Sequence, residues 1–423
     1  MPKHFATLAE WLRWQETLNP RRIELGLERV RSVAEALKLE APAPAVITVA
    51  GTNGKGSSVA LLEAILAAAG YRVGAYTSPH LLRYNERVRL AGAEAGDEQL
   101  CTAFAAVEAA RGDTALTYFE FGTLAALWLF QQAKPDVALL EVGLGGRLDA
   151  VNIVGPQLAL ITSIGLDHTD WLGPDRESIG REKAGILRAW TPAVCADPEP
   201  PASVHEAAAE LGLRLMQLGR DFGLRVHAAH WDWQGWDGDI RGLPLPRLAG
   251  HHQLRNAAGV IAGLQLLADA LPLPRKAIEH GLRSYHLPGR FEIGENEGVE
   301  VVFDVAHNVE SAAALADNLR AHPAAGRSFA VCGALRDKPL AAMLAQLAPL
   351  VDGWYLGGLA DVPRGLTAQE LPVAAATLAQ AGVHPTVAEA FHAARAAARA
   401  GDRIVVWGSF HTVEVVKRAW TKN

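Results

Sequence analysis

The chain has 423 residues, of which 50% are hydrophobic and 20% charged, so it is long enough for two domains with cores of their own. Its formal net charge is -6. Without a basic excess to neutralise phosphates, we expect no nucleic-acid partner. No apolar run approaches the roughly 20 residues that a membrane helix needs, so we expect no membrane partner either.

The start of the chain and its cysteines indicate a cytoplasmic protein. The first residues, Met-Pro-Lys-His-Phe, lead into a stretch with no uninterrupted apolar segment, unlike a signal peptide. Cys101, Cys195 and Cys332 lie far apart in sequence. A sparse, odd set of cysteines is typical of a reducing compartment and excludes a CxxC metal or redox site. No long exposed apolar seam is evident, so we expect a monomer.

The first half of the chain alternates short β-branched runs with Ala/Leu-rich helical stretches, which predicts an α/β fold with a mostly parallel sheet. The predicted strands are apolar throughout, as expected when helices cover both faces of a sheet. We predict strands at 46–50, 72–76, 136–141, 158–162 and 193–196, and helices at 57–69, 97–110, 123–133 and 177–187.

The second half begins with a different pattern. Residues 219–246 hold Trp231, Trp233 and Trp236 among Asp and Gly residues, which predicts a small antiparallel ribbon, and a helix is expected at 253–271. The polar, Gly-containing segment 288–298 is predicted to be a linker between a domain at 1–287 and a smaller Rossmann-like domain at 299–423. In the latter we predict strands at 299–305, 327–332, 353–356 and 403–407, and helices at 311–321, 340–350, 368–381 and 388–400.

A glycine-rich loop follows the first predicted strand: Gly51-Thr-Asn-Gly-Lys-Gly-Ser57. Strand, Gly-rich turn, lysine, hydroxyl and helix is the arrangement that cradles nucleotide phosphates through backbone N–H groups and a helix N-terminus. The general P-loop pattern fits imperfectly, because Val49 stands where it has glycine and Gly56 separates Lys55 from Ser57. A plain Gly-rich turn is the alternative. We predict that this loop binds nucleotide phosphates.

Polar side chains follow the other predicted strands of this sheet. Ser78 follows one strand, Glu141 ends the next, and His168 comes after a third. Since ligands of doubly wound sheets bind beyond the carboxyl ends of the strands, these three groups are candidates to hold Mg²⁺ against ATP. Mg²⁺ prefers oxygen ligands, so the imidazole is the less usual member. Taken singly, each residue can also be a cap, a strand-end carboxylate or an outer hydrogen-bond donor.

These motifs resemble those of the bacterial dihydrofolate synthase/folylpolyglutamate synthases, a family within the Mur ligase superfamily. The matching stretches run in order along nearly the whole chain: Gly51–Ser57, Thr77-Ser-Pro-His-Leu-Leu-Arg-Tyr84, Leu116-Thr-Tyr-Phe-Glu-Phe-Gly122, Leu140-Glu-Val-Gly-Leu-Gly-Gly-Arg-Leu-Asp-Ala150, Leu166-Asp-His-Thr-Asp-Trp-Leu-Gly173, Gly180-Arg-Glu-Lys-Ala-Gly185, Leu287-Pro-Gly-Arg290, Phe303-Asp-Val-Ala-His-Asn308 and Gly408-Ser-Phe-His411.

The resemblance implies a ligase that joins L-glutamate to dihydropteroate and to reduced folates through an acyl phosphate made from ATP. It implies an ATP- and pterin-binding first domain and a glutamate ligase second domain. It also implies two Mg²⁺ ions, with Lys183 carbamylated so that its added carboxylate serves the second ion. The residues implied for ATP are Asn53, Gly54, Lys55, Gly56, Ser57, Asn256, Arg290 and Asp304, with Lys55, Lys183 and His307 in catalysis.

For the pterin, the resemblance implies three segments of the first domain. Tyr118 and Phe119 can pack on a flat heterocycle, and Asp149 can accept hydrogen bonds from pterin N–H groups. Both aromatics can equally be core residues. The implied pterin-binding residues are Arg22, Ile23, Glu24, Leu25, Thr117, Tyr118, Phe119, Glu120, Leu148, Asp149 and Ala150.

Three other functions compete with this interpretation. A synthase with only one of the two activities comes first, and a Mur ligase acting on a cell-wall UDP-sugar peptide comes second. The Gly56 spacer and the Thr117–Glu120 segment favour folate over the cell-wall substrate. A P-loop regulator without enzymatic activity would leave the strand-end polar residues without a role.

Overall fold

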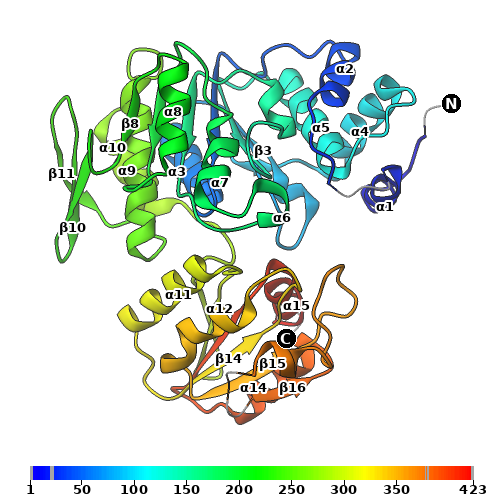
Figure 1. The fold of residues 1–423 in the computed structure, drawn as a ribbon, viewed down its shortest axis with the longest axis vertical. Helices are drawn as coiled ribbons and strands as arrows, with labels where there is room; N and C mark the ends of the chain where they lie inside the picture. The colour runs from blue at the N-terminus through cyan, green and yellow to red at the C-terminus, as the bar shows by residue number, and fades with distance from the viewer. Residues whose placement is uncertain (1–2, 20–22, 377, 379–380, 421–423) are drawn as a thin grey trace. The chain divides into compact units, whose positions relative to one another are not determined.

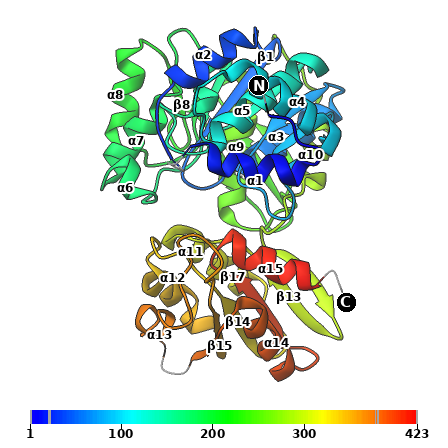
Figure 2. The ribbon, with the colours of Figure 1, turned by 90° about the vertical axis from the view of Figure 1, so that its right-hand side faces the viewer.

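The computed structural model describes residues 3–19, 23–376, 378 and 381–420. The chain divides into two compact units, shown in Figures 1 and 2. Unit 1 comprises Met1–Arg247 and Gln253–His286, and unit 2 comprises Leu248–His252 and Leu287–Asn423. Each unit has its own sheet and core. Within the described ranges, no helix combines the length and the apolar character needed to span a bilayer.

Unit 1 contains an eight-stranded sheet of order β4-β3-β2-β5-β1-β6-β7-β8. The strands β2, β5, β1, β6, β7 and β8 run parallel, and β3 and β4 add an antiparallel edge beside β2. The strands are β1 (Ala45–Ala50), β2 (Val73–Tyr76), β3 (Val88–Leu90), β4 (Ala93–Glu94), β5 (Val137–Glu141), β6 (Leu158–Ile161), β7 (Ala193–Cys195) and β8 (Leu215–Gln217).

Helices cover both faces of this sheet. The helices are α1 (Leu8–Leu18), α2 (Glu28–Ala36), α3 (Lys55–Ala68), α4 (Asp97–Arg111), α5 (Tyr118–Ala133), α6 (Thr169–Leu172), α7 (Arg176–Ala184), α8 (Ala202–Glu210), α9 (His251–Leu266) and α10 (Arg275–Ser284), with short 3₁₀ turns η1 (Tyr84–Arg87) and η2 (Ala150–Ile153). Alternate strand residues serve the two faces. Val46, Ala138 and Ala159 pack with α1, α2, α4 and α5, whereas Leu158 and Leu160 meet glycines of α9 on the other side.

A separate three-stranded antiparallel ribbon, of order β11-β10-β9, also belongs to unit 1. Its strands are β9 (Gly223–Val226), β10 (His230–Gln234) and β11 (Ile240–Pro244), and Figure 1 shows β10 and β11 beside α9 and α10. Trp231 and Trp233 are fully buried, and the Trp233 indole donates to the Ala258 carbonyl of α9 at 3.1 Å. The ribbon is thus fastened to the unit by one face.

Unit 2 has a six-stranded sheet of order β12-β13-β17-β14-β15-β16, parallel except for β12. α11 and α12 supply the core on one face, and α14 packs against α15 and the sheet. Its elements are β12 (Glu292–Asn296), β13 (Val299–Phe303), α11 (Val309–Ala321), β14 (Ser328–Cys332), α12 (Leu340–Leu347), η3 (Ala348–Leu350), β15 (Gly353–Gly357), α13 (Leu371–Ala374), β16 (Ala381–His384), α14 (Val387–Ala397), β17 (Arg403–Trp407) and α15 (Phe410–Trp420).

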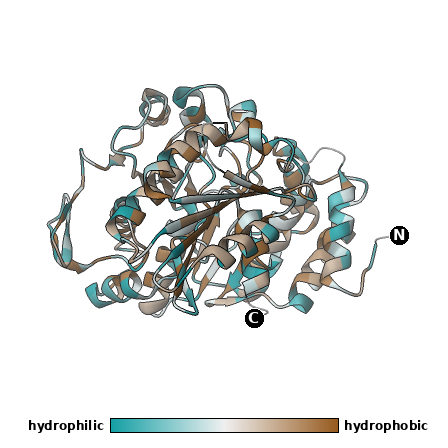
Figure 3. Ribbon diagram, turned by 90° about the horizontal axis from the view of Figure 1, so that it is seen from below, coloured by the Kyte–Doolittle hydropathy of each residue, from teal (hydrophilic) through white to brown (hydrophobic). Residues whose placement is uncertain are grey.

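The α/β fold class, with a large mostly parallel sheet followed by a smaller sheet unit, is confirmed, and so is the antiparallel ribbon. In Figure 3 the strands are mostly brown, and teal is concentrated on the helices, as the apolar strand pattern requires.

Four local predictions were wrong or incomplete. The segment 288–298 is not a linker, because 292–296 form β12, paired antiparallel with β13. Where the structure describes the helix predicted at 368–381, it has only the single turn α13, and residue 381 already belongs to strand β16. Helices α1, α2, α8, α10 and α15 were not predicted, and α5 begins at Tyr118 rather than at residue 123.

Candidate active site

Four loops meet at one edge of the unit 1 sheet. β2, β5, β1 and β6 are neighbours in that order and run parallel. Their carboxyl ends therefore lie side by side, and the loops that leave them start at the same edge. The predicted phosphate loop, Ser78, Glu141 and the segment that holds His168 all follow these four strands.

The phosphate loop depends on two of its glycines. Gly51 has φ +153°, and a Cβ there would lie 1.8 Å from Thr162 Oγ1. Gly54, with φ +91°, is the N-cap of α3, and a Cβ there would lie 2.4 Å from Asn256 Oδ1. Only glycine fits a backbone of this conformation with so little space beside it. The loop therefore lies against Thr162, which follows β6, and against Asn256 of α9. The following turn of α3 directs its N–H groups toward the loop.

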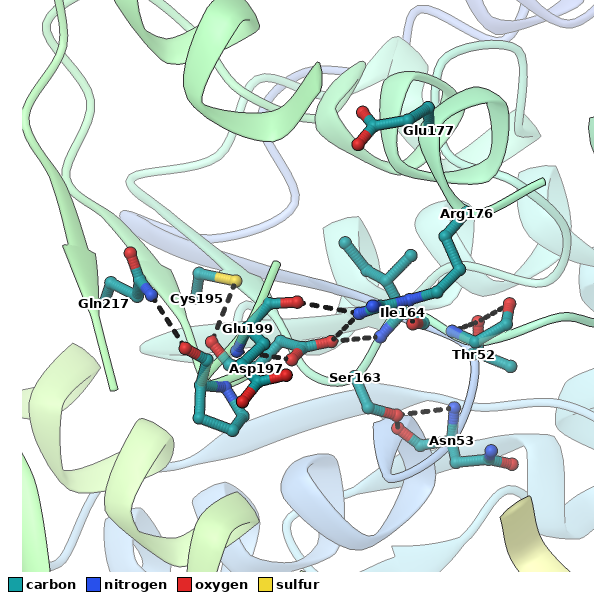
Figure 4. A network of polar contacts seen from close by, with 12 residues as sticks. Thr52, Asn53, Ser163, Ile164, Arg176, Glu177, Cys195, Asp197, Glu199 and Gln217 are labelled. Atoms are coloured by element: carbon teal, nitrogen blue, oxygen red, sulfur yellow. Dashed lines mark hydrogen bonds and ion pairs between the residues drawn. The ribbon is translucent and has the colours of Figure 1, made fainter. Parts of the chain in front are cut away.

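The loop after β6 fixes the phosphate loop from the side (Figure 4). Ser163 Oγ lies 3.2 Å from the Asn53 nitrogen and 3.1 Å from the Asn53 carbonyl. Thr52 Oγ1 donates to the Gly165 carbonyl at 3.1 Å and accepts from the Gly165 nitrogen at 3.0 Å. The two loops therefore form one hydrogen-bonded unit, and a displacement of either would move the other.

A second layer of contacts holds the loop after β6 in its turn (Figure 4). The Asp197 carboxylate, at the end of β7, accepts from the Ile164 nitrogen at 2.9 Å. Arg176 Nε donates to the Ile164 carbonyl at 2.8 Å, and its Nη2 lies 3.3 Å from Asp197 Oδ2 and donates to the Glu199 carbonyl at 2.8 Å. Both backbone polar groups of Ile164 are thereby satisfied by side chains. Neither Arg176 nor Asp197 was among the predicted site residues.

Two lysines converge on one carbonyl of the phosphate loop. Lys55 Nζ donates to Gly51 O at 3.0 Å, and Lys183 Nζ of α7 donates to the same oxygen at 2.9 Å. Lys183 is only 4% exposed. Burial, reinforced by the charge of Lys55 and opposed by Asp167 and Asp149, lowers the pKa of Lys183 to about 7. A substantial share of this amine is therefore neutral near pH 7, which is the form that reacts as a nucleophile.

Two of the three metal candidates, Ser78 and Glu141, contact each other. The Ser78 backbone nitrogen donates to Oε2 of the buried Glu141 carboxylate at 3.0 Å. His168 is half-buried at the start of α6, with φ +52°. It follows β6, two strands away from β5 along the same edge. A buried carboxylate with a serine residue beside it suits a hard divalent cation, which prefers oxygen ligands.

Asp149 is largely occupied by its own loop. Its Oδ2 accepts from the nitrogens of Gly143 and Leu144 at 3.0 and 2.9 Å, and its Oδ1 accepts from Val151 at 3.0 Å. Burial, opposed by these bonds and by Lys55, raises the pKa of Asp149 to about 6. A carboxylate offers about four acceptor positions, so three are already used. The predicted contact to pterin N–H groups would have to use the remaining one. Its neighbours Leu148 and Ala150 are half-buried and buried.

Among Thr117–Glu120, two residues cap a helix. Thr117 Oγ1 accepts from the Glu120 nitrogen at 3.2 Å, and Glu120 Oε2 accepts from the Thr117 nitrogen at 2.7 Å, which is a capping box at the start of α5. Tyr118 and Phe119 are half-buried. The Phe119 ring lies against Gly143, where a Cβ would come within 2.6 Å of it. The two rings are thus partly core and partly accessible.

Arg29 joins two of the segments implied for the pterin. It pairs with Glu24 at 3.2 Å and with Glu120 at 2.8 Å. Ile23 and Leu25 beside Glu24 are half-buried, and Arg22 lies outside the described residues. Sequence reasoning named both carboxylates but missed Arg29, although an arginine four to five residues past the matched segment was a visible candidate for the pairing.

Asn256 of α9 is buried against the phosphate loop, as the contact with Gly54 requires. Its Nδ2 donates to Gln253 Oε1 at 3.2 Å, and Gln253 Nε2 in turn donates to Ser57 Oγ at 3.3 Å. Asn256 and the predicted phosphate-binding residues are therefore brought together by contacts within unit 1.

The remaining predicted residues belong to unit 2: Asp304 and His307 follow β13, and Arg290, which precedes β12, lies near Asp304. Asp304 Oδ2 accepts from the Phe291 nitrogen at 2.9 Å, and its Oδ1 accepts from Ala306 at 2.8 Å. Burial raises the pKa of Asp304, and the nearby Arg290 guanidinium opposes that rise. His307 Nδ1 lies 2.8 Å from the Val305 carbonyl. In the neutral ring Nδ1 therefore carries the hydrogen, and Nε2 is the acceptor. Asn308 caps α11 through the Ser311 nitrogen at 2.9 Å.

Comparison with known proteins bears out the resemblance. Residues 49–263 match the Mur ligase middle domain, and residues 289–410 match the glutamate ligase domain of Mur ligases. The dihydrofolate synthase/folylpolyglutamate synthase of Escherichia coli (strain K12) is 49% identical over 412 residues, covering 97% of this chain and 95% of the relative. The protein of the same name from Haemophilus influenzae is 41% identical over 434 residues, covering 97% of both chains.

Solved structures agree over the whole chain. The structure of E. coli FolC in complex with DHPP and ADP has a TM-score of 0.94 at 48% identity and covers 100% of this chain and 99% of that one. A bifunctional folylpolyglutamate synthase/dihydrofolate synthase with Mn, AMPPNP and L-glutamate bound has a TM-score of 0.92 at 48% identity, covering 100% of both chains. The chain therefore belongs to the dihydrofolate synthase/folylpolyglutamate synthase family of Mur ligases.

Proposed function

We propose that this chain uses ATP to ligate L-glutamate to dihydropteroate, forming dihydrofolate, and to reduced folates, forming folylpolyglutamates. The observation that carries the proposal is the convergence of Lys55 and Lys183 on the Gly51 carbonyl of a phosphate loop. Two cationic groups aimed at one backbone oxygen favour the arrival of an anion. The relatives with ADP, AMPPNP and L-glutamate bound support ATP and glutamate as the ligands.

The first chemical step is proposed to occur at the unit 1 edge. The pterin substrate's carboxylate attacks the γ-phosphorus of ATP, which gives an acyl phosphate and ADP. Negative charge on the transferring phosphoryl group is stabilised mainly by positioned cations and N–H donors. In this proposal Lys55 and the N–H groups of Asn53–Ser57 supply them, and Asn256 supports the loop from α9.

A divalent ion fits the residues at the same edge. Glu141 offers a carboxylate, and Ser78, whose backbone nitrogen contacts that carboxylate, offers a hydroxyl. His168 offers an imidazole from the loop after β6. Mg²⁺ held there would neutralise charge on the phosphate oxygens. We propose a second ion served by Lys183 as a carbamate. The lowered pKa of Lys183 supports this, because only a neutral amine adds to CO₂. Carbamylation would also convert a buried cation into an anion.

In the second step the amine of L-glutamate attacks the acyl phosphate, and the tetrahedral intermediate collapses with loss of phosphate. We propose that unit 2 is the glutamate ligase domain, with Arg290 and Asp304 also serving ATP. His307 is proposed to take the proton from the attacking amine through Nε2, since Nδ1 is held by Val305. The pterin is proposed to use residues 22–25, 117–120 and 148–150, with the rings of Tyr118 and Phe119 against the heterocycle.

We further propose that the enzyme acts as a cytoplasmic monomer on these small molecules, without nucleic acid or membrane partners. The three cysteines are free, and Cys195 and Cys332 are buried, which supports a reducing compartment. Light scattering of the purified protein tests the monomer, and a dimer mass would contradict it.

The test of function is phosphate release by the purified protein with ATP, Mg²⁺ and L-glutamate, comparing dihydropteroate with tetrahydrofolate as third substrate. Turnover with both, dependent on glutamate and lost in Lys55→Ala, is the expected result. Turnover with one alone would make the chain a synthase of single function. Turnover with neither, but with a UDP-sugar peptide, would overturn the folate assignment.

A further inference from the structure

The outward face of the β9–β10 hairpin gathers three side chains that the ligase reaction does not use. Cross-strand pairs put Val226 opposite Trp231 and Arg225 opposite Asp232. The next pair is closed by the His227 nitrogen, which donates to the His230 carbonyl at 2.9 Å. Because side chains alternate along a strand, the histidines and the aspartate share the face opposite the buried tryptophan.

The donor atoms of these three residues lie close together. His227 Nε2 is 3.0 Å from Asp232 Oδ2, and the two imidazole rings are stacked with centroids 4.4 Å apart and an interplanar angle of 20°. One donor atom from each residue lies within 4.8 Å of the other two. A hydrogen bond between His227 and Asp232 explains that pair, but it gives no role to the second imidazole.

The carboxylate is also held from behind. Asp232 Oδ1 accepts from the Gly242 nitrogen of β11 at 2.8 Å, which leaves Oδ2 directed toward the histidines. Carboxylates that ligate metals are commonly fixed by such an outer hydrogen bond. The opposite face of the hairpin is anchored by Trp231 and Trp233, so the strands that present the three groups are rigidly supported.

We propose that His227, His230 and Asp232 form a binding site for one divalent transition-metal ion of the Zn²⁺ type. Two imidazole nitrogens and one carboxylate oxygen are the donor set that suits Zn²⁺ rather than Mg²⁺, and a water molecule completes four-coordination. Bound metal crosslinks the ends of β9 and β10 at their two-residue turn. The site belongs to the ribbon and shares no residue with the phosphate-loop edge.

The test measures Zn²⁺ binding to the untagged protein by equilibrium dialysis, with Mg²⁺ in excess to occupy sites built from oxygen donors. The wild-type chain is expected to bind one Zn²⁺ more than His227→Ala, His230→Ala or Asp232→Asn. Loss of an outer-shell partner weakens metal sites about 10- to 100-fold, so loss of a direct ligand is expected to weaken this one by more than about 100-fold.

Two controls separate the site from general zinc binding. His280→Ala removes an exposed histidine of α10 in the same unit and is expected to leave the stoichiometry unchanged. Arg225→Ala removes the cation opposite Asp232 and is expected to bind Zn²⁺ at least as tightly as wild type. Equal zinc stoichiometry in wild type and in the three ligand variants would overturn the proposal.

A second measurement is the visible absorption spectrum of bound Co²⁺. Co²⁺ replacing Zn²⁺ is expected to give the visible absorption bands of a four-coordinate ion, and His230→Ala is expected to lose them. Only the weak bands of a six-coordinate ion in the wild type would also overturn the proposal.

Discussion

The two units arrange charge differently at the ends of their strands. In unit 1, the side-chain nitrogens of Lys55 and Lys183 donate to one neutral carbonyl, Gly51 O. In unit 2, burial raises the pKa of the Asp304 carboxyl, and the nearby Arg290 guanidinium opposes that rise. The carboxylate is further fixed by two backbone nitrogens.

The difference indicates that the two regions are preorganised for their ligands to different extents. Converging cations cost free energy until an anion joins them, so the unit 1 edge gains most when a phosphate or a carbamate is present. The Asp304 carboxylate is already held by two backbone nitrogens before any ligand arrives, so the unit 2 loop is the more preorganised region. Changes at the first region should therefore affect ligand-dependent steps most strongly.

The largest effect is expected for Lys183→Ala. If the carbamate of Lys183 serves a metal ion, its loss should lower kcat by at least about 100-fold, as for loss of a metal ligand. Acetate in the buffer should restore part of the activity by replacing the missing carboxylate. The matched control is Lys55→Ala, whose proposed role is that of a cation and which acetate should not rescue. Full activity of Lys183→Ala without acetate, or equal rescue of both variants, would contradict the carbamate.

The next largest effect is expected for Asp149→Ala. Three backbone nitrogens lose their acceptor, and each buried donor left without a partner costs about 1–3 kcal/mol, so the free energy of unfolding should fall by about 3 kcal/mol or more. Urea denaturation measures this loss of stability, and an unchanged midpoint would show that Asp149 does not stabilise its loop through these hydrogen bonds. If Asp149 also holds the pterin, the dihydropteroate reaction should suffer more than the folate reaction. Equal losses would leave only the structural role.

Asp149 shows which features of the site the sequence predicts and which it does not. The pattern of apolar strands separated by helices predicts the sheet, and the position after a strand predicts which loops meet at its edge. The hydrogen-bond partners of a side chain are set by the folded loop. From sequence alone, a role of Asp149 as acceptor for three backbone N–H groups could not be distinguished from a direct contact with substrate. The same holds for the capping box between Thr117 and Glu120.

Edge elements were the other difficulty. β12, with the sequence Glu-Ile-Gly-Glu-Asn, is largely polar and contains a glycine, as suits an edge strand that pairs through its backbone and buries little. Its composition is that of a linker. The cluster of His227, His230 and Asp232 was missed for a related reason, since its members meet only through the register of a hairpin. Arg176 begins α7 and Asp197 follows β7, so the two meet only in the folded chain and share no motif.

A smaller effect is expected in unit 2, for Asp304→Asn. The amide can accept from only one of the two nitrogens that the carboxylate holds, and Arg290 loses its counter-charge. The loss of one hydrogen bond and one charge partner is worth about 1–2 kcal/mol, so KM for ATP should rise about tenfold. An unchanged KM together with an unchanged melting temperature would remove the distinction between the two regions.

The pH dependence of activity tests the unit 1 cations without a mutation. The pKa of Lys183 is lowered from 10.5 to about 7, so below that pH the amine is an ammonium that cannot add CO₂. We expect the activity of protein pre-equilibrated with bicarbonate to fall about tenfold per pH unit below the pKa. The unfolded chain keeps the proton up to about pH 10.5, so the free energy of unfolding should rise between about pH 7 and that value. A flat profile for both quantities would show that the amine is charged in the folded protein.

The smallest effect is expected where the phosphate loop is held indirectly. Arg176→Met removes the donor to the Ile164 carbonyl but leaves the aliphatic part of the side chain, and the arginine is half-exposed, so we expect a loss of about 1 kcal/mol in unfolding free energy. Because Thr52 and Asn53 are bonded to the same loop, KM for ATP should rise a few-fold while kcat changes little. The control is Arg181→Met on the same helix, whose ion pair with Glu206 is exposed and should contribute about 0.5 kcal/mol or less. If the two variants have the same KM, the network around Asp197 stabilises the fold without positioning the phosphate loop; if only Arg176→Met shifts it, the loop after β6 transmits its geometry to the nucleotide.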